Sequence, residues 1–121
     1  MRTRPKKTTQ AIMVRPRLYI GDSIAIGPGK IDLLRQVAAT HSISAAARAS
    51  GMTYKRAWLL IDSLNQGFGR PVVETATGGK GGGGATLTML GSQLVERYAV
   101  IEARLSAAAQ DELEALRRLT K

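Results

Sequence analysis

The stretch that decides the fold is 42–65, which reads SISAAARASGMTYKRAWLLIDSLN. A serine opens an alanine-rich segment, Gly51 follows it, and Thr53 stands before an amphipathic segment. Serine and threonine are preferred helix N-caps, and glycine suits a tight turn that needs a positive φ. The stretch therefore predicts two helices, over 43–50 and 54–65, joined by a short turn in a helix–turn–helix. An ordinary helical hairpin in a small bundle is the alternative.

The outward side of the 54–65 helix is the candidate DNA-reading surface. Its apolar positions 57, 60, 61 and 64 recur at the spacing of one buried face. Because base edges are read from the exposed N-terminal turn of such a helix, Thr53, Tyr54 and Lys55 are the first candidates. The full set of candidate DNA-binding residues is Ser42, Ser44, Thr53, Tyr54, Lys55, Arg56, Trp58 and Lys80.

The segments on either side complete a small domain. β-Forming residues around Gly21 predict one kinked strand or a short hairpin within 14–26. Apolar spacing after a Gly-Pro-Gly break predicts a helix over 30–40. Two β-prone runs, 71–77 and 85–88, then predict a hairpin.

The loop between those two runs is rich in glycine and reads GGKGGGG over 78–84. A nucleotide-binding P-loop is disfavoured, because Lys80 is followed by glycine instead of serine or threonine and the loop joins two strands. The pattern favours a wing whose backbone amides and Lys80 lie against DNA phosphate. A plain flexible linker is the alternative.

Residues 89–119 predict one long helix or two. Leu94, Tyr98, Ile101 and Leu105 recur at spacings of four and three, as in a coiled-coil seam. We expect this stripe to form a homodimer; packing of the stripe on its own domain is the alternative.

Composition narrows the functional classes. The 121 residues hold 18 Lys+Arg and 9 Asp+Glu, a net charge of +9, with no cysteine and one histidine. The absence of cysteine excludes disulfides and thiolate metal sites, and no paired acid and base suggests catalysis. We therefore expect no enzyme activity, no metal site, no cofactor and no membrane partner in a cytoplasmic protein. The basic excess predicts a polyanionic partner, double-stranded DNA first.

The residues named above resemble the ModE family of molybdate-responsive regulators. The resemblance is carried by His41–Ala47, Gly51–Trp58 and Val73–Thr88, and the LysR regulators share a more distant likeness in the helix–turn–helix. It implies a dimeric, DNA-binding transcriptional regulator. Family members bind molybdate in a further region of small β-barrels, and we expect neither that domain nor molybdate binding within this chain.

The expected fold is mainly α with a small β-hairpin wing: a winged helix–turn–helix followed by a long C-terminal dimerisation helix. The expected division is a flexible basic arm (1–12), the DNA-binding domain (13–88) and the dimerisation helix (89–121). The leading function is sequence-specific regulation of transcription. A non-sequence-specific architectural or RNA-binding protein is the alternative, and a small nucleotide-using enzyme is a more distant one.

Overall fold

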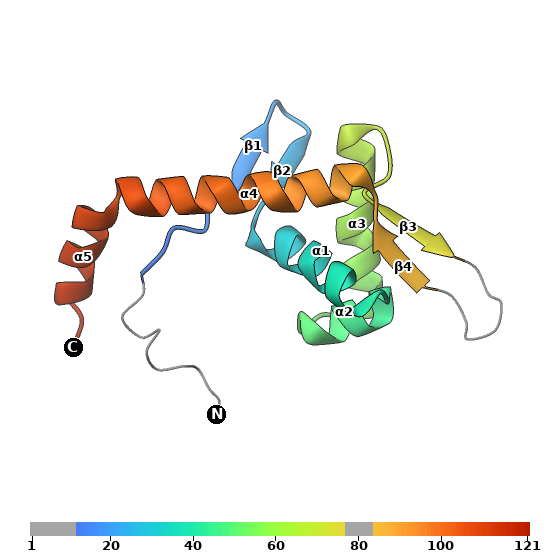
Figure 1. Ribbon diagram of the computed structural model, residues 1–121, viewed down its shortest axis with the longest axis horizontal. Coiled ribbons are helices and arrows are strands. Elements are labelled where there is room, and N and C mark those ends of the chain that lie inside the picture. The colour runs from blue at the N-terminus through green and yellow to red at the C-terminus, as the bar shows by residue number, and fades with distance from the viewer. Residues whose placement is uncertain (1–11, 77–83) are drawn as a thin grey trace.

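The computed structural model describes residues 12–76 and 84–121. These residues form five helices and two separate two-stranded antiparallel sheets, and both hairpins lie at the outside of the helical part (Figure 1). The elements in chain order are β1 (Leu18–Ile20), β2 (Ile24–Ile26), α1 (Pro28–Thr40), α2 (Ile43–Ala49), α3 (Tyr54–Phe68), β3 (Val73–Ala76), β4 (Gly84–Leu87), α4 (Met89–Ala108) and α5 (Gln110–Arg118).

Side-chain caps begin both helices of the helix–turn–helix. Ser42 Oγ accepts the Ala45 N–H at 3.0 Å at the start of α2, and Thr53 Oγ1 accepts the Arg56 N–H at 3.0 Å at the start of α3. Gly51 lies between them with φ +71°. Each cap satisfies a backbone donor that the helix itself leaves unpaired, and replacing such a cap by alanine typically costs about 1 kcal/mol.

Helix α3 is longer than the sequence predicts. The expected end was residue 65, but the helix continues to Phe68 and is closed by Gly69 in the left-handed region, φ 73°. The Gly69 N–H donates to the Asn65 carbonyl at 2.9 Å, as is common at helix C-termini. The extra turn brings Phe68 against the core.

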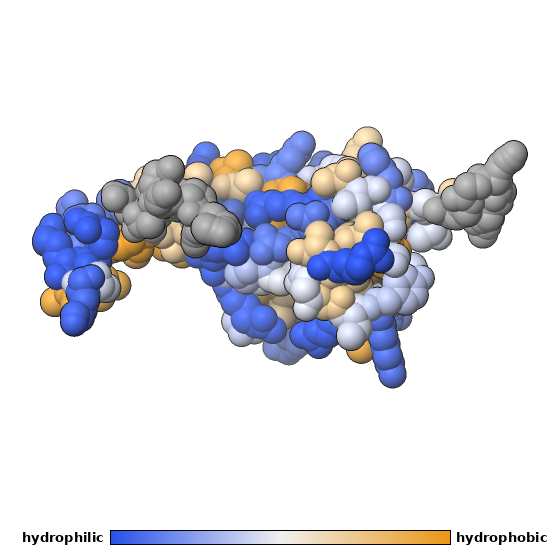
Figure 2. All heavy atoms as spheres, turned by 90° about the horizontal axis from the view of Figure 1, so that it is seen from below, coloured by the Kyte–Doolittle hydropathy of each residue, from blue (hydrophilic) through white to orange (hydrophobic). Residues whose placement is uncertain are grey.

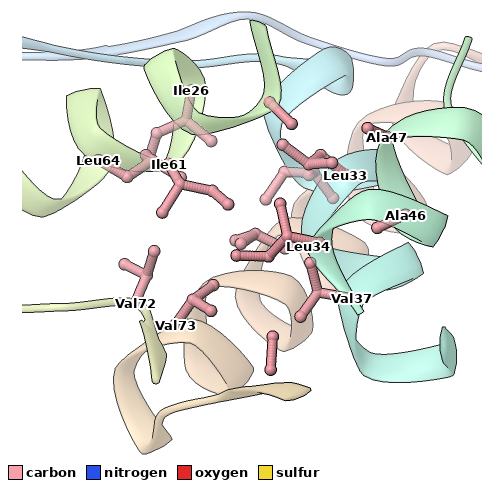
Figure 3. Packing of buried hydrophobic residues seen from close by; sticks show 14 of the residues in the cluster. Ile26, Leu33, Leu34, Val37, Ala46, Ala47, Ile61, Leu64, Val72 and Val73 are labelled. Carbon is pink, nitrogen blue, oxygen red and sulfur yellow. The ribbon is translucent and has the colours of Figure 1, made fainter. Parts of the chain in front are cut away.

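One apolar core joins α1, α2, α3 and the base of the wing (Figure 3). Figure 3 shows the side chains from these elements pointing toward one another, with alanines on α2 where that helix packs closely against its neighbours. The buried members are Ile26, Ile31, Leu33, Leu34, Val37, Ile43, Ala46, Ala47, Ala57, Ile61, Leu64, Val72, Val73, Ala85 and Tyr98. This arrangement, with the β3–β4 hairpin after α3, is a winged helix–turn–helix.

The wing is attached to the helix–turn–helix by backbone contacts. Strands β3 and β4 pair antiparallel, with Val73 opposite Leu87 and Ala76 opposite Gly84. The Ala85 N–H donates to the carbonyl of His41, in the turn between α1 and α2, at 2.9 Å. The base of the wing is therefore held beside the start of α2. The glycine-rich tip and Lys80 lie outside the described residues, as does nearly all of the expected basic arm.

The 14–26 segment forms a hairpin, one of the two expected alternatives. β1 pairs with β2, Leu18 opposite Ile26, around a turn in which Gly21 has φ +60°. Residues before the hairpin run along α4: the Val14 N–H donates to Ser106 Oγ at 2.9 Å, and Arg15 pairs with Glu102 at 3.1 Å.

The expectation for the apolar stripe of α4 needs correction. Tyr98 is only 1% exposed and belongs to the core of its own chain, and its hydroxyl donates to the Pro16 carbonyl at 2.5 Å. Leu94 is half-buried against the same core. The first half of the predicted seam therefore packs on its own domain, because the chain before β1 and helix α1 cover it. Of the four predicted seam residues, Ile101 is half-buried and only Leu105, at 40%, is exposed.

An ion-pair network reinforces this attachment. Arg15 and Arg35 each contact both Asp32 and Glu102, at distances of 2.7–3.3 Å. The network joins the segment before β1, α1 and α4.

In the part of the chain that the structure describes, no helix is long and apolar enough to cross a membrane.

Candidate nucleic-acid interface

The N-terminal half of α3 presents the predicted side chains to solvent. Lys55 and Arg56 are exposed, and Tyr54 and Leu59 are each 56% exposed. Trp58 is half-buried: it packs on the core and meets the Tyr54 ring edge-on, with centroids 6.4 Å apart and planes at 78°. The core therefore fixes the indole, and the indole in turn positions the more exposed phenol ring.

A hollow of about 350 Å³ lies between the starts of α2 and α3 and the base of the wing. It brings together four of the predicted residues, Ser42, Ser44, Tyr54 and Trp58. The wing contributes Thr75, Ala76, Gly84 and Ala85, which sequence reasoning missed. Local sequence gives no signal for them, because only the pairing of the wing with the His41 turn brings them to this place.

A second hollow, about 480 Å³, lies on the outward side of α3 and includes Lys55. Its other lining residues are Tyr54, Trp58, Leu59 and Asp62. The two hollows share Tyr54 and Trp58, so they form one continuous face that includes Ser42, Ser44 and Lys55. Thr53 and Arg56 are exposed nearby on the chain but line neither hollow. Lys80 is not placed, since it lies outside the described residues.

The hydroxyl groups of this face have a further capacity for hydrogen bonding. Ser42 and Thr53 use their oxygens as acceptors in the helix caps, and Ser44 Oγ accepts from Arg48 at 3.3 Å. A hydroxyl that accepts one bond still carries a proton to donate. All three can therefore cap or orient a neighbour and also donate to a phosphate oxygen.

Positive charge on this side of the molecule is not neutralised locally. Among the described residues, Arg48, Lys55 and Arg56 have no carboxylate oxygen within 4.0 Å, whereas Arg15 and Arg35 are paired with Asp32 and Glu102. The cations of the helix–turn–helix are thus available to an external anion.

Lys30 on α1 adds to this positive field. Its Nζ donates to the Ala25 carbonyl at 2.6 Å and to Ser63 Oγ on α3 at 3.1 Å. Burial lowers the pKa of Lys30, and the nearby charges of Arg17 and Arg56 lower it further. Arg17 and Arg56 therefore both lie close enough to Lys30 to act on its charge, and sequence reasoning selected only Arg56 among the three cations. A phosphate at this place would relieve their mutual repulsion.

Comparison with known proteins agrees with this geometry. Residues 29–92, from α1 to the first turn of α4, match the family described as "Bacterial regulatory helix-turn-helix protein, lysR family". The chain belongs to the lysR family of helix–turn–helix proteins.

Curated relatives of this lysR-family chain are named as regulators and as molybdenum-pterin-binding proteins. It is 44% identical over 81 residues to the DNA-binding transcriptional dual regulator ModE of Escherichia coli (strain K12), an alignment covering 67% of this chain and 31% of ModE. It is 46% identical over 78 residues to the molybdenum-pterin-binding protein MopB of Rhodobacter capsulatus, covering 64% and 29%. The similarity thus spans less than a third of each relative.

A solved structure shares the lysR-family fold. The crystal structure of a LysR family transcriptional regulator superposes with a TM-score of 0.52 at 21% identity, over 68% of this chain and 26% of that one. At this identity the likeness concerns the fold alone. It confirms the expected winged helix–turn–helix architecture, in which the second helix of the motif, α3 here, is the one that enters DNA grooves in proteins of this type.

Proposed function

We propose that the chain is a sequence-specific regulator of transcription that binds double-stranded DNA as a homodimer in the cytoplasm. The observation that carries the proposal is the face formed by the starts of α2 and α3 and the base of the wing, on helices whose exposed cations have no carboxylate partner among the described residues. Membership of the lysR family and the regulator names of the relatives support it.

Each part of the face has a distinct role in this proposal. The first turns of α3 enter the major groove, where Tyr54, Lys55, Arg56 and Trp58 approach base edges and the flanking backbone. Ser42, Ser44 and Thr53 donate to phosphates, helped by the free backbone N–H groups at the start of α3. The wing, with Lys80 at its tip, follows the backbone beside the groove.

The experiment that tests the proposal is selection of bound sequences from random DNA duplexes, followed by affinity measurement on the selected and scrambled sites. A specific protein enriches one motif and binds it far more tightly than competitor DNA, at a stated salt concentration. Equal affinity for all duplexes, or tighter binding to RNA, would overturn the proposal in favour of an architectural or RNA-binding protein.

Lys55→Ala is expected to reduce the ratio of specific to non-specific affinity by about tenfold, within the roughly 1–3 kcal/mol that a good base contact contributes. The matched control is Arg97→Ala, which removes the same charge from an exposed position of α4. That control should weaken binding to all sequences alike or not at all. An unchanged ratio for Lys55→Ala would show that this lysine does not read bases.

The dimer is expected to form through the outer half of α4 and through α5. Val100, Leu105, Leu116 and Leu119 are exposed apolar residues there, and Figure 2 shows apolar surface among hydrophilic surface at the α5 end of the molecule. Sedimentation at micromolar concentration should give about twice the 12.9 kDa of one chain. Leu105→Asp should shift the mass toward one chain, with the exposed Arg104→Ala as control. A monomeric wild type contradicts this part of the proposal.

The relatives named for ModE and for molybdenum-pterin binding direct the proposed regulation toward molybdenum metabolism. The shared residues lie in the helix–turn–helix part, so what this likeness supports is a related DNA target. Molybdate binding by these 121 residues is not part of the proposal.

A further inference from the structure

The solvent-facing side of α3 carries a cationic, an apolar and an anionic side chain, one after another along the helix. Lys55, Leu59 and Asp62 are all exposed and follow one another at spacings of four and three, so they lie on one side of the helix. Leu59 is 56% exposed, and it lies between a cation and an anion on the solvent side of the helix. The opposite side of α3 is the one that is buried in the core. Packing within the described chain therefore does not account for a leucine here.

The surroundings of Leu59 form a shallow, mainly apolar hollow. Tyr54, Trp58 and Leu59 line it, with Lys55 and Asp62 completing the lining. The Tyr54 and Trp58 rings are held at 78° to each other, and the indole is anchored on the core. The hollow is therefore a fixed apolar surface on the helix that the proposed function places in the major groove.

DNA offers one apolar group in that groove. Of the four bases, only thymine carries a methyl group on its major-groove edge, and leucine-like surfaces contact it favourably. A phosphate is a poor occupant, because the carboxylate of Asp62 borders the hollow and would repel it. The cations Lys55 and Arg56 still attract the duplex as a whole, so the complementary occupant is a base edge within a polyanion.

We propose that Leu59, supported by Tyr54 and Trp58, is a specificity-determining residue that recognises the C5-methyl group of thymine. The inference rests on the proposed function and deepens it, since it assigns A·T pairs to the part of the target site that faces the middle of α3. Lys55, one turn earlier, faces the neighbouring base pair.

The test removes the methyl group alone. In the selected duplex each thymine is replaced in turn by deoxyuridine, which keeps base pairing and every hydrogen-bonding group. Wild-type protein should lose about fourfold in affinity at one or two positions, the value of one buried methyl group. Leu59→Ala should bind the unmodified duplex more weakly by a similar factor and should show no further loss with deoxyuridine at the same positions.

Two controls accompany this measurement. Ile20→Ala truncates an aliphatic side chain that is 49% exposed in β1, outside both hollows and the proposed dimer surface, and should keep the full deoxyuridine effect. Because Leu59 is exposed, its truncation should leave thermal stability nearly unchanged, which separates a loss of contact from a loss of fold.

The results that overturn the inference are distinct from those that overturn the proposed function. If no motif is enriched by selection, the proposed function fails and the inference falls with it. If a motif is enriched but lacks thymine in its contacted positions, or if deoxyuridine costs nothing, only the inference fails. An equal deoxyuridine effect in wild type and Leu59→Ala assigns the methyl contact to another residue. A change in sedimentation mass for Leu59→Ala, without any deoxyuridine effect, assigns the hollow to a protein interface.

Discussion

Tyr98→Ala is expected to lower the free energy of unfolding by about 3–5 kcal/mol, the usual range for removing a buried aromatic side chain. Tyr98 is 1% exposed and joins the middle of α4 to the core, and its hydroxyl bonds the Pro16 carbonyl at 2.5 Å. Its loss therefore leaves a cavity and removes one of the contacts that hold the segment before β1 against α4. Tyr98→Phe keeps the ring and should cost only about 1 kcal/mol.

Denaturant unfolding at several protein concentrations measures this effect and separates it from dimerisation. If Tyr98 is buried within one chain, its truncation destabilises the fold at every protein concentration. If Tyr98 instead faced a second chain, its truncation would lower the oligomeric mass and leave the stability of the monomer unchanged. Arg97→Ala, the exposed neighbour, is the control and should change stability by less than about 0.5 kcal/mol.

The ionisation of Tyr98 is expected to lower the free energy of unfolding at alkaline pH. Burial raises the pKa of Tyr98, and the negative charge of Glu102 raises it further. The folded protein therefore holds the phenolic proton more tightly than the unfolded chain does. This contribution is complete below about pH 10, the usual pKa of tyrosine, and is lost as the pH rises through the higher folded value. Tyr98→Phe should remove it, which unfolding curves measured from neutral to alkaline pH will show.

Gly91→Ala is expected to destabilise the protein by about 1–3 kcal/mol, although alanine favours helices over glycine by about 1 kcal/mol. Gly91 lies in the first turn of α4, and a Cβ there would clash with the backbone carbonyl oxygen of Val72. That carbonyl also accepts the Thr88 N–H at 3.0 Å, so it cannot turn away without breaking the start of α4.

The matched control is Gly29→Ala, in the first turn of α1, where an added Cβ meets nothing within 4 Å. This substitution should be neutral or slightly stabilising. Because Val72 leads directly into β3, Gly91→Ala should also displace the wing and weaken DNA binding, whereas Gly29→Ala should not. Thermal unfolding of both variants measures the contrast, and equal melting temperatures would show that α4 and the wing adjust without cost.

The helix–turn–helix could be predicted from sequence because its determinants are local. Ser42 and Thr53 cap the helices from within three residues, and Gly51 supplies the positive φ of the turn without any distant partner. The predicted end of α3 was less accurate. Its last turn depends on Gly69 as a left-handed cap and on the packing of Phe68, and the second of these is a tertiary contact.

The candidate interface was only partly predictable for the same reason. The residues on α2 and the start of α3 follow from helix position, so Ser42, Ser44, Tyr54 and Trp58 were selected and do lie together. Lys30 and Arg17 were not selected, because the proximity of Lys30 to Arg17 and to Arg56 depends on how α1 packs beside α3 and the segment before β1. No periodicity in the sequence contains that information.

The sequence by itself determined the helix–turn–helix, the wing strands and the apolar stripe on α4, because caps, turns and periodicity are set by residues close together in the chain. Tertiary structure alone decided what covers that stripe. Periodicity shows that one side of a helix is apolar but does not say which surface meets it. Here Val14–Pro16 lie along α4 and enclose Tyr98, through contacts between residues 82–92 positions apart. Of the four predicted stripe residues, Leu105 in the outer half of α4 is therefore the one that stays exposed.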